Sequence, residues 1–146
     1  MFFGRYDHTL DEKGRITIPV RFREALLYGA YITRGFDQNL LVWVAADFEE
    51  VARRVNQMSI TDPTARILRR MIFSTAEPVE IDRAGRILIP GFLREAGGLG
   101  KMVVIVGTGN SYFEIWSPER WAEHDVLLQD QSMLERLTAL DLPLKS

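Results

Sequence analysis

The sequence predicts an α+β fold made of two tandem copies of one short β-hairpin unit, with helices at the periphery. Residues 11–25 and 82–96 align without a gap at an offset of 71, and nine of the fifteen aligned positions are identical. Unrelated segments of ordinary composition share about one position in such a window. The repeat continues at an offset of 73, where Trp43 aligns with Trp116 and Phe48 with Trp121. In both copies, extended runs and turn formers alternate with helical patterns, which indicates strands and helices in one unit.

Each copy begins with a predicted hairpin. In each copy, an Asp-x-x-Gly turn precedes a run rich in aliphatic residues, at 15–18 in the first copy and at 86–89 in the second. Gly14 and Gly85 are the residues that can take a positive φ in these turns without steric cost.

A short helix is predicted after each hairpin, because Pro19 and Pro90 suit a first helical turn and Gly29 and Gly97 suit its end. Its apolar positions are expected to be buried. They are Phe22, Ala25 and Leu26 in the first copy, and Leu93 and Ala96 in the second.

Two more strands and a closing helix complete each copy. The predicted strands are residues 30–34 and 40–44 in the first copy, and 102–106 and 112–116 in the second. Asp47 with Glu50 is typical of a capping box, and Ser117 places a capping hydroxyl before Pro118.

An amphipathic helix is predicted between the copies. It begins at Asp62-Pro63, with a stripe formed by Ile67, Leu68, Met71 and Ile72. Beyond the second copy, residues 131–142 carry leucines at helical spacing before Pro143, which indicates either a last helix or a tail that folds against a partner. The predicted organisation is repeat 1 at 5–47, a helical connector at 48–75, repeat 2 at 76–119 and a helical or flexible tail at 120–146.

The composition excludes several classes of protein. The chain of 146 residues has no cysteine and two histidines, so neither a disulfide framework nor a thiolate metal site is expected. No apolar run reaches the ~18 residues of a membrane span, and the first residues do not resemble a signal peptide. Without a nucleophile, base or metal constellation, an enzyme is the least favoured class. No catalytic residue, metal, cofactor, small-molecule substrate or membrane contact is expected.

The charge is small overall but uneven. The net charge of -2 argues against an indiscriminate binder of polyanions. Residues 119–146 sum to -3, so residues 1–118 sum to +1, and 15 of the 18 basic side chains are arginine. Arginine is the side chain suited to bidentate contacts with phosphates and guanine edges.

These motifs resemble a known family. The pattern Leu-Asp-x-Lys-Gly-Arg-Ile-x-Ile-Pro after a Phe-Phe-Gly start, with a second Asp-x-x-Gly-Arg-Ile-x-Ile-Pro, is similar to the MraZ family of transcriptional regulators over essentially the whole chain. The repeated unit resembles the AbrB-type swapped hairpin, in which two halves interlock into one small barrel-like core. The resemblance implies an intramolecular pseudo-two-fold core, and ring-like homo-oligomers that bind double-stranded DNA repeats upstream of the division and cell-wall gene cluster. It also implies a cytoplasmic, nucleoid-associated protein.

The family signature falls on Asp11 and Arg15 and on Asp82 and Arg86. An aspartate at the start of a tight turn can accept its backbone N–H groups, and an arginine just past the glycine can project its planar fork. The alternative is that each aspartate pairs with its arginine and merely stabilises the turn. The expected turn residues are Asp11, Gly14, Asp82 and Gly85; the expected DNA contacts are Arg15, Arg86, Lys13, Arg5, Arg83 and Arg23.

The two copies are not expected to contribute equally to DNA binding. The second copy has Ala84 and Leu88 where the first has Lys13 and Thr17. Residues 5–23 sum to +2, whereas the equivalent residues 76–94 sum to zero. The runner-up function is an antitoxin-like module with autoregulatory DNA binding, because the same hairpin serves both families and the C-terminal stripe suits a protein partner.

Overall fold

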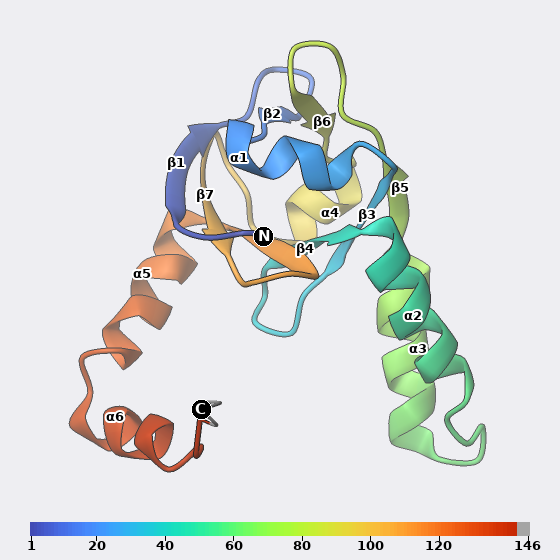
Figure 1. Cartoon of the computed structure of the whole chain (residues 1–146), viewed down its shortest axis with the longest axis vertical. Coiled ribbons are helices and arrows are strands. Elements are labelled where there is room, and N and C mark those ends of the chain that lie inside the picture. Colours follow the sequence, from blue (N-terminus) through green and yellow to red (C-terminus); the bar gives the residue numbers. More distant parts are fainter. Residues whose placement is uncertain (143–146) are drawn as a thin grey trace, which may run out of the picture.

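The computed structural model describes residues 1–142 of the chain. Figure 1 shows a β-rich core that carries two hairpin tips at one end and two separate helical arms at the other. The elements are β1 (Arg5–Thr9), β2 (Arg15–Thr17), α1 (Val20–Arg23), the 3-10 helix η1 (Glu24–Leu26), β3 (Ala30–Arg34), β4 (Leu40–Val44), α2 (Ala45–Asn56), α3 (Pro63–Thr75), β5 (Glu77–Val79), β6 (Arg86–Leu88), α4 (Gly91–Ala96), β7 (Met102–Gly107), β8 (Tyr112–Trp116), α5 (Pro118–Leu127) and α6 (Gln131–Thr138).

The sheet interleaves strands of the two copies. Within residues 1–142, the strands form a six-stranded sheet of order β1-β7-β8-β4-β3-β5 and a two-stranded ribbon, β2-β6, and every pair is antiparallel. Because β1 to β4 belong to the first copy and β5 to β8 to the second, the order is symmetric about the β4–β8 pair. Each copy lends its first strand to the other copy, β1 to β7 and β5 to β3. The predicted α+β class, with two interlocked halves, is therefore confirmed.

The sheet is open, so the prediction of a barrel core was wrong. β1 and β5 are its two edges and do not pair with each other. The three-residue strands β2 and β6 bond to one another in a separate ribbon. Within residues 1–142, one isolated bridge, from Leu10 to Ile16, links β1 to that ribbon. The ribbon and this single bridge do not form a continuous ladder of hydrogen bonds from one edge of the sheet to the other. The strands therefore do not close into a barrel.

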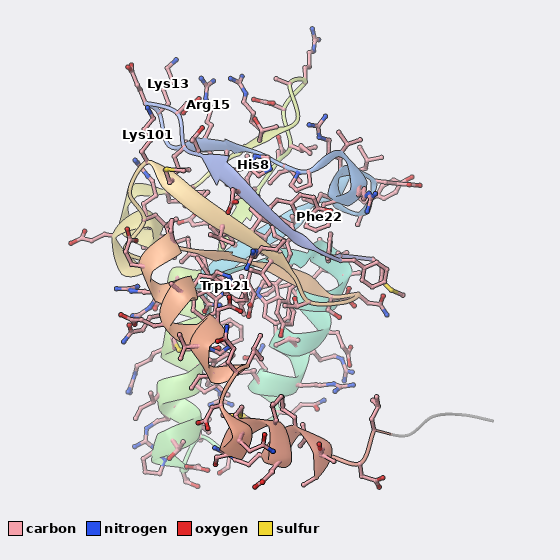
Figure 2. All side chains as sticks on the ribbon, turned by 90° about the vertical axis from the view of Figure 1, so that its left-hand side faces the viewer. His8, Lys13, Arg15, Phe22, Lys101 and Trp121 are labelled. Atoms are coloured by element: carbon pink, nitrogen blue, oxygen red, sulfur yellow. The ribbon has the colours of Figure 1, made fainter. Side chains whose placement is uncertain are left out.

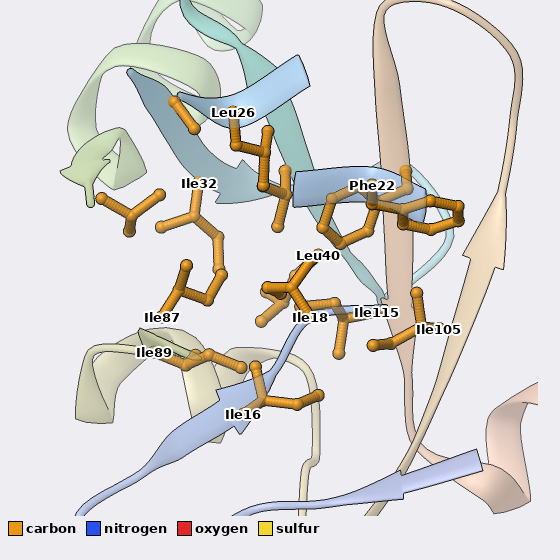
Figure 3. Close-up of a cluster of buried hydrophobic side chains, with 14 of the residues drawn as sticks. Ile16, Ile18, Phe22, Leu26, Ile32, Leu40, Ile87, Ile89, Ile105 and Ile115 are labelled. Carbon is orange, nitrogen blue, oxygen red and sulfur yellow. The ribbon is translucent and has the colours of Figure 1, made fainter. Parts of the chain in front are cut away.

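Both copies contribute to one core. The isoleucines of the ribbon segments point into it and are at most 1% exposed; they are Ile16, Ile18, Ile87 and Ile89. Figure 3 shows them with Leu40 and isoleucines of the main sheet. Ile16 pairs with Ile87 at the centre of the ribbon. Since side chains alternate along a strand, this register turns Thr17 and the signature arginines outward.

Helix α2 starts earlier than the sequence predicts. It begins at Ala45 with no side-chain cap, so the capping box at Asp47 and Glu50 was wrong. Ala45 instead donates its N–H to the carbonyl of Gly29 at 3.1 Å. A remote carbonyl thus satisfies one of the amides at the start of the helix that have no partner within it. Glu50 pairs with Arg53 and Arg54 farther along the helix.

The connector helix α3 packs against α2 (Figure 1). It begins at Pro63, as the sequence predicts, and Asp62 caps it by accepting the N–H of Thr64 at 2.9 Å. Leu68 and Ile72 lie in or against the cluster around Trp43 and Phe48. Ile67 is 63% exposed, so its place in the buried stripe was wrong. Residue 67 lies five positions before Ile72, about 140° away around a helix of 3.6 residues per turn, which leaves it at the exposed margin of the stripe.

The C-terminal stretch is helical over α6, which Asp130 caps by accepting the N–H of Ser132 at 3.1 Å. Met133 is half-buried, whereas Leu134, Leu137 and Leu140 are exposed. Pro143, the predicted end of this stretch, lies outside the described residues. Among the helices of residues 1–142, none combines the length and the apolar character needed to cross a membrane.

Candidate nucleic-acid interface

Both signature turns have the same internal geometry. Asp11 Oδ1 accepts the backbone N–H groups of Lys13 and Arg15 at 2.9 and 2.8 Å, and its Oδ2 accepts Nε of Arg15 at 2.7 Å. In the second copy, Asp82 binds the N–H groups of residues 84 and 86 at 2.9 and 2.8 Å, and Nε of Arg86 at 2.9 Å. Each aspartate therefore fixes the backbone of its turn and also orients its arginine. The resulting ion pair is the one expected if the signature served only to stabilise the turn.

The glycines complete these turns. Gly14 and Gly85 have φ of 84° and 78°, the left-handed region that other residues enter only with strain. Both N–H groups close the turn onto the carbonyl of the aspartate three residues earlier, at 3.0 Å.

Only the Nε edge of each signature arginine is committed to its own turn. Nη1 of Arg86 also lies 3.9 Å from Oδ2 of Asp11, in the other copy. Within the described part of the chain, the terminal nitrogens of Arg15 have no hydrogen-bond partner. A guanidinium fixed along one edge has two terminal NH₂ groups to offer a ligand.

The turn carboxylates are held in their ionised form. The N–H of Arg15, followed by the side chain of Arg15 and the N–H of Lys13, holds the pKa of Asp11 below its ordinary value. The N–H and side chain of Arg86 do the same to the pKa of Asp82. Hydrogen bonds donated to a carboxylate favour its charged form.

We expect acid to loosen both turns. A folded-state pKa that is lowered means that the stabilisation is complete above the ordinary pKa and is lost as the pH falls through the lowered value, below about pH 4. The amide shifts of Lys13 and Ala84, followed by NMR from pH 6 to pH 2, should titrate with midpoints below the ordinary aspartate value. Asp11→Asn should abolish the titration at Lys13 and leave that at Ala84. Midpoints at or above the ordinary value would contradict the hydrogen bonding described above.

The β2-β6 ribbon brings the two turns together at one end of the molecule (Figure 1). The carbonyl of Gly85 accepts the N–H of Ile18 at 2.8 Å, and that of Gly14 accepts the N–H of Ile89 at 2.9 Å. Because each turn is bonded to the strand of the other copy, four of the predicted DNA contacts share one surface, here called the tip. They are Lys13, Arg15, Arg83 and Arg86.

Of the other two predicted DNA contacts, Arg5 lies away from the tip, and Arg23 lies against the second turn beside Gly85. Arg5 is at the far end of β1 from Thr9, four residues and about 13 Å away along a strand. Its Nη1 lies 3.7 Å from Oδ2 of Asp125 in α5. Arg23 is half-buried, and its Nε donates to the carbonyl of Ile18 at 2.9 Å.

Lys101 is a basic residue of the tip that sequence reasoning missed. It directly precedes β7, and its carbonyl accepts the N–H of Leu10 at 2.7 Å. Figure 2 shows it beside Lys13 and Arg15, at the same end of the molecule. The residue belongs to the second copy yet flanks the first turn, so only the exchange of β1 onto β7 reveals its position.

The second turn has different neighbours. Tyr28, which is 96% exposed, lines a surface hollow together with Glu80 and Ile81, just before that turn. An acidic and an aromatic side chain thus stand beside the second turn, where the first has Lys101. The structure adds to the charge difference that the sequence predicts between the copies.

Comparison with known proteins agrees with this duplication. Residues 1–71 and 72–139 each match the family model described as MraZ protein, antitoxin-like. A protein of Thermomicrobium roseum is 46% identical over 142 residues, which cover 96% of this chain and 99% of the relative. One of Roseiflexus castenholzii is 52% identical over 83% of this chain and 84% of its own, and one of Moorella thermoacetica is 42% identical over 97% and 100%. All three carry the name Transcriptional regulator MraZ.

Proposed function

Because this chain belongs to the MraZ family, and is a DNA-binding transcriptional regulator rather than an enzyme, we propose that it binds short promoter repeats of the division and cell-wall gene cluster through its tip. The observation that carries the proposal is the meeting of both signature turns on one ribbon. A regulator of this kind acts on the chromosome, so we place it in the cytoplasm, associated with the nucleoid.

The tip has the shape and chemistry that DNA recognition requires. A two-stranded β ribbon fits the major groove, where base edges can be distinguished. Lys13 and Arg83 are exposed and suit phosphates. Arg15 and Arg86 present terminal nitrogens from positions fixed by Asp11 and Asp82, which suits bidentate contact with guanine.

The experiment that tests this proposal is the selection of genomic fragments by the full-length protein. We expect the bound fragments to share a short repeated sequence upstream of division and cell-wall genes. Lys13→Ala should weaken binding to specific and scrambled DNA alike and lower the salt slope by about one. Enrichment of no common sequence would contradict recognition of a specific site.

We further propose that the working unit is a ring-like homo-oligomer. A chain with a net charge of -2, whose tip carries only a small group of basic side chains, should bind one DNA repeat weakly. Both arms carry exposed apolar side chains that suit contact with other copies, including Ile60 and Ile67 near the α2–α3 connection and Leu137 and Leu140 at the C-terminal end. The antitoxin-like alternative has less support, because the second half of the chain folds into the same core as the first.

An oligomer of this kind predicts avidity. We expect DNA with several correctly spaced repeats to bind at least tenfold more tightly than DNA with one repeat, because linked sites raise the effective concentration of each further contact. Titration of both DNAs with the same protein preparation, next to sedimentation analysis of its size, measures the ratio. Equal affinity for one repeat and for several would rule out avidity.

A further inference from the structure

Each turn glycine is buried by an arginine of the opposite copy. A Cβ built on Gly14 would lie 2.7 Å from Cζ and 2.8 Å from Nε of Arg94. A Cβ built on Gly85 would lie 2.6 Å from Nε and 2.7 Å from Nη1 of Arg23. Both glycines are buried although they stand in turns at one end of the molecule. The guanidinium of each copy therefore covers the turn of the other.

The two arginines are anchored in the same way. Nε of Arg23 donates to the carbonyl of Ile18 at 2.9 Å, and Nε of Arg94 donates to the carbonyl of Ile89 at 3.1 Å. The N–H groups of the same two isoleucines donate to the carbonyls of the opposite turn glycines. Each isoleucine thus donates its amide N–H to the opposite turn. Its carbonyl accepts a hydrogen bond from the arginine that covers that same turn.

Ion pairing does not explain these positions. Within residues 1–142, neither arginine forms a salt bridge with a carboxylate. Arg21, on the same short helix as Arg23, is exposed instead. The recurrence of one arrangement in both copies, at Arg23 and at Arg94, indicates a shared role at the turns.

We propose that Arg23 and Arg94 are positioning residues, each of which sets the DNA-contacting turn of the opposite copy. Arg94 of the second copy holds the turn that carries Lys13 and Arg15, and Arg23 of the first copy holds the turn that carries Arg83 and Arg86. The inference rests on the proposed binding of DNA through the tip. In this proposal Arg23 does not contact DNA directly but positions the turn that contains Gly85. The DNA-contacting turn of each repeat therefore depends on an arginine of the other repeat.

Amide exchange in the full-length protein tests the crossed pattern without DNA. Arg94→Ala should speed exchange around Gly14 and leave the turn at Gly85 largely unchanged, and Arg23→Ala should do the reverse. Arg21→Ala removes the same charge from the same helix as Arg23 and should change neither turn. Faster exchange in the turn of the mutated residue's own copy, or no change in either turn, would overturn the proposal.

DNA titration at several salt concentrations tests whether the arginine itself touches DNA. We expect Arg94→Ala to weaken specific binding about 5- to 10-fold, by loosening the turn that holds the reading side chains, with the salt slope of the parent. A slope lower by about one would indicate a lost phosphate contact and would overturn positioning. Arg94→Lys keeps the charge but not the planar group, so full recovery of affinity with that variant would also overturn it. If the parent binds no specific DNA, the proposed function fails, while the exchange pattern still decides the contact between the copies.

Discussion

Replacing Arg15 with alanine is expected to weaken specific DNA binding more than replacing Arg86 does. Loss of a bidentate arginine–guanine contact costs about 1 to 3 kcal/mol per site, or about 5- to 150-fold, and relaxes specificity there. Each arginine is held through Nε by its own aspartate, and Nη1 of Arg86 also lies 3.9 Å from Oδ2 of Asp11, so the expected difference arises from their surroundings. Lys13 and Lys101 add positive charge beside Arg15, whereas Glu80 lies near the second turn.

Oligomerisation would multiply this difference, because every unit in a ring carries the same substitution. The measurement is a titration of Arg15→Ala and Arg86→Ala on specific and scrambled DNA at two salt concentrations. Both variants should first be shown to fold and assemble like the parent. The two arginines provide a matched pair, since each substitution removes the same side chain from the same turn geometry.

Equal losses, or a larger loss for Arg86→Ala, would overturn the asymmetry between the copies. No loss for either variant would reduce the signature to a structural turn, in which the aspartate–arginine pair contributes only to the shape of the hairpin. Removal of Lys101 provides a further comparison, because it lies beside Arg15 and outside the signature. Lys101→Ala should weaken binding to all DNA sequences alike.

Replacing Phe22 with alanine is expected to cause the largest loss of stability. Its ring is fully buried and lies 4.9 Å from the ring of Phe2, 5.4 Å from that of Tyr6 and 5.1 Å from that of Phe113. Truncation of a buried phenylalanine costs about 3 to 5 kcal/mol, a large share of the roughly 5 to 15 kcal/mol that stabilises a native protein. Urea unfolding at a fixed protein concentration measures the loss, because stability and assembly are linked.

Phe36 provides the matched control for this substitution, since the same side chain there is 66% exposed. Phe36→Ala should change the free energy of unfolding by no more than about 0.5 kcal/mol. A loss below about 1.5 kcal/mol for Phe22→Ala would mean that its ring is not enclosed as described. Phe22 also lies in α1 next to Arg23, so the variant's DNA binding should be interpreted only after its fold has been checked.

Local rules were enough for much of this fold. The Asp-x-x-Gly repeats predicted both turns and the positive φ of Gly14 and Gly85. A backbone conformation that favours glycine can be recognised from the glycine itself. The cap at Ser117 was predicted for the same reason, since a capping side chain reaches an amide only two or three residues away. The strand–helix order within each copy and the duplication are likewise properties of the sequence alone.

Local rules failed where a distant segment supplied the partner. The N–H of Ala45, the first residue of α2, is bound by the carbonyl of Gly29, and no side chain caps the helix, so the capping box at Asp47 does not form. Ile67 fits a helical stripe, yet the position of α2 decided which face of α3 is covered. Alternation along a strand shows which side chains point inward, but it does not show which strand lies alongside.

The sequence by itself determined the two turns, their aspartates and arginines, and the aliphatic strands that follow them, because these depend on contacts within a few residues. Only the tertiary structure decided that β1 pairs with β7 and β5 with β3, that the sheet stays open, and that Lys101 and Arg94 lie against the first turn. Such pairings join residues far apart along the chain, and they are selected by how both copies bury their isoleucines in one core. That choice depends on the packing of the whole molecule, which no short segment specifies.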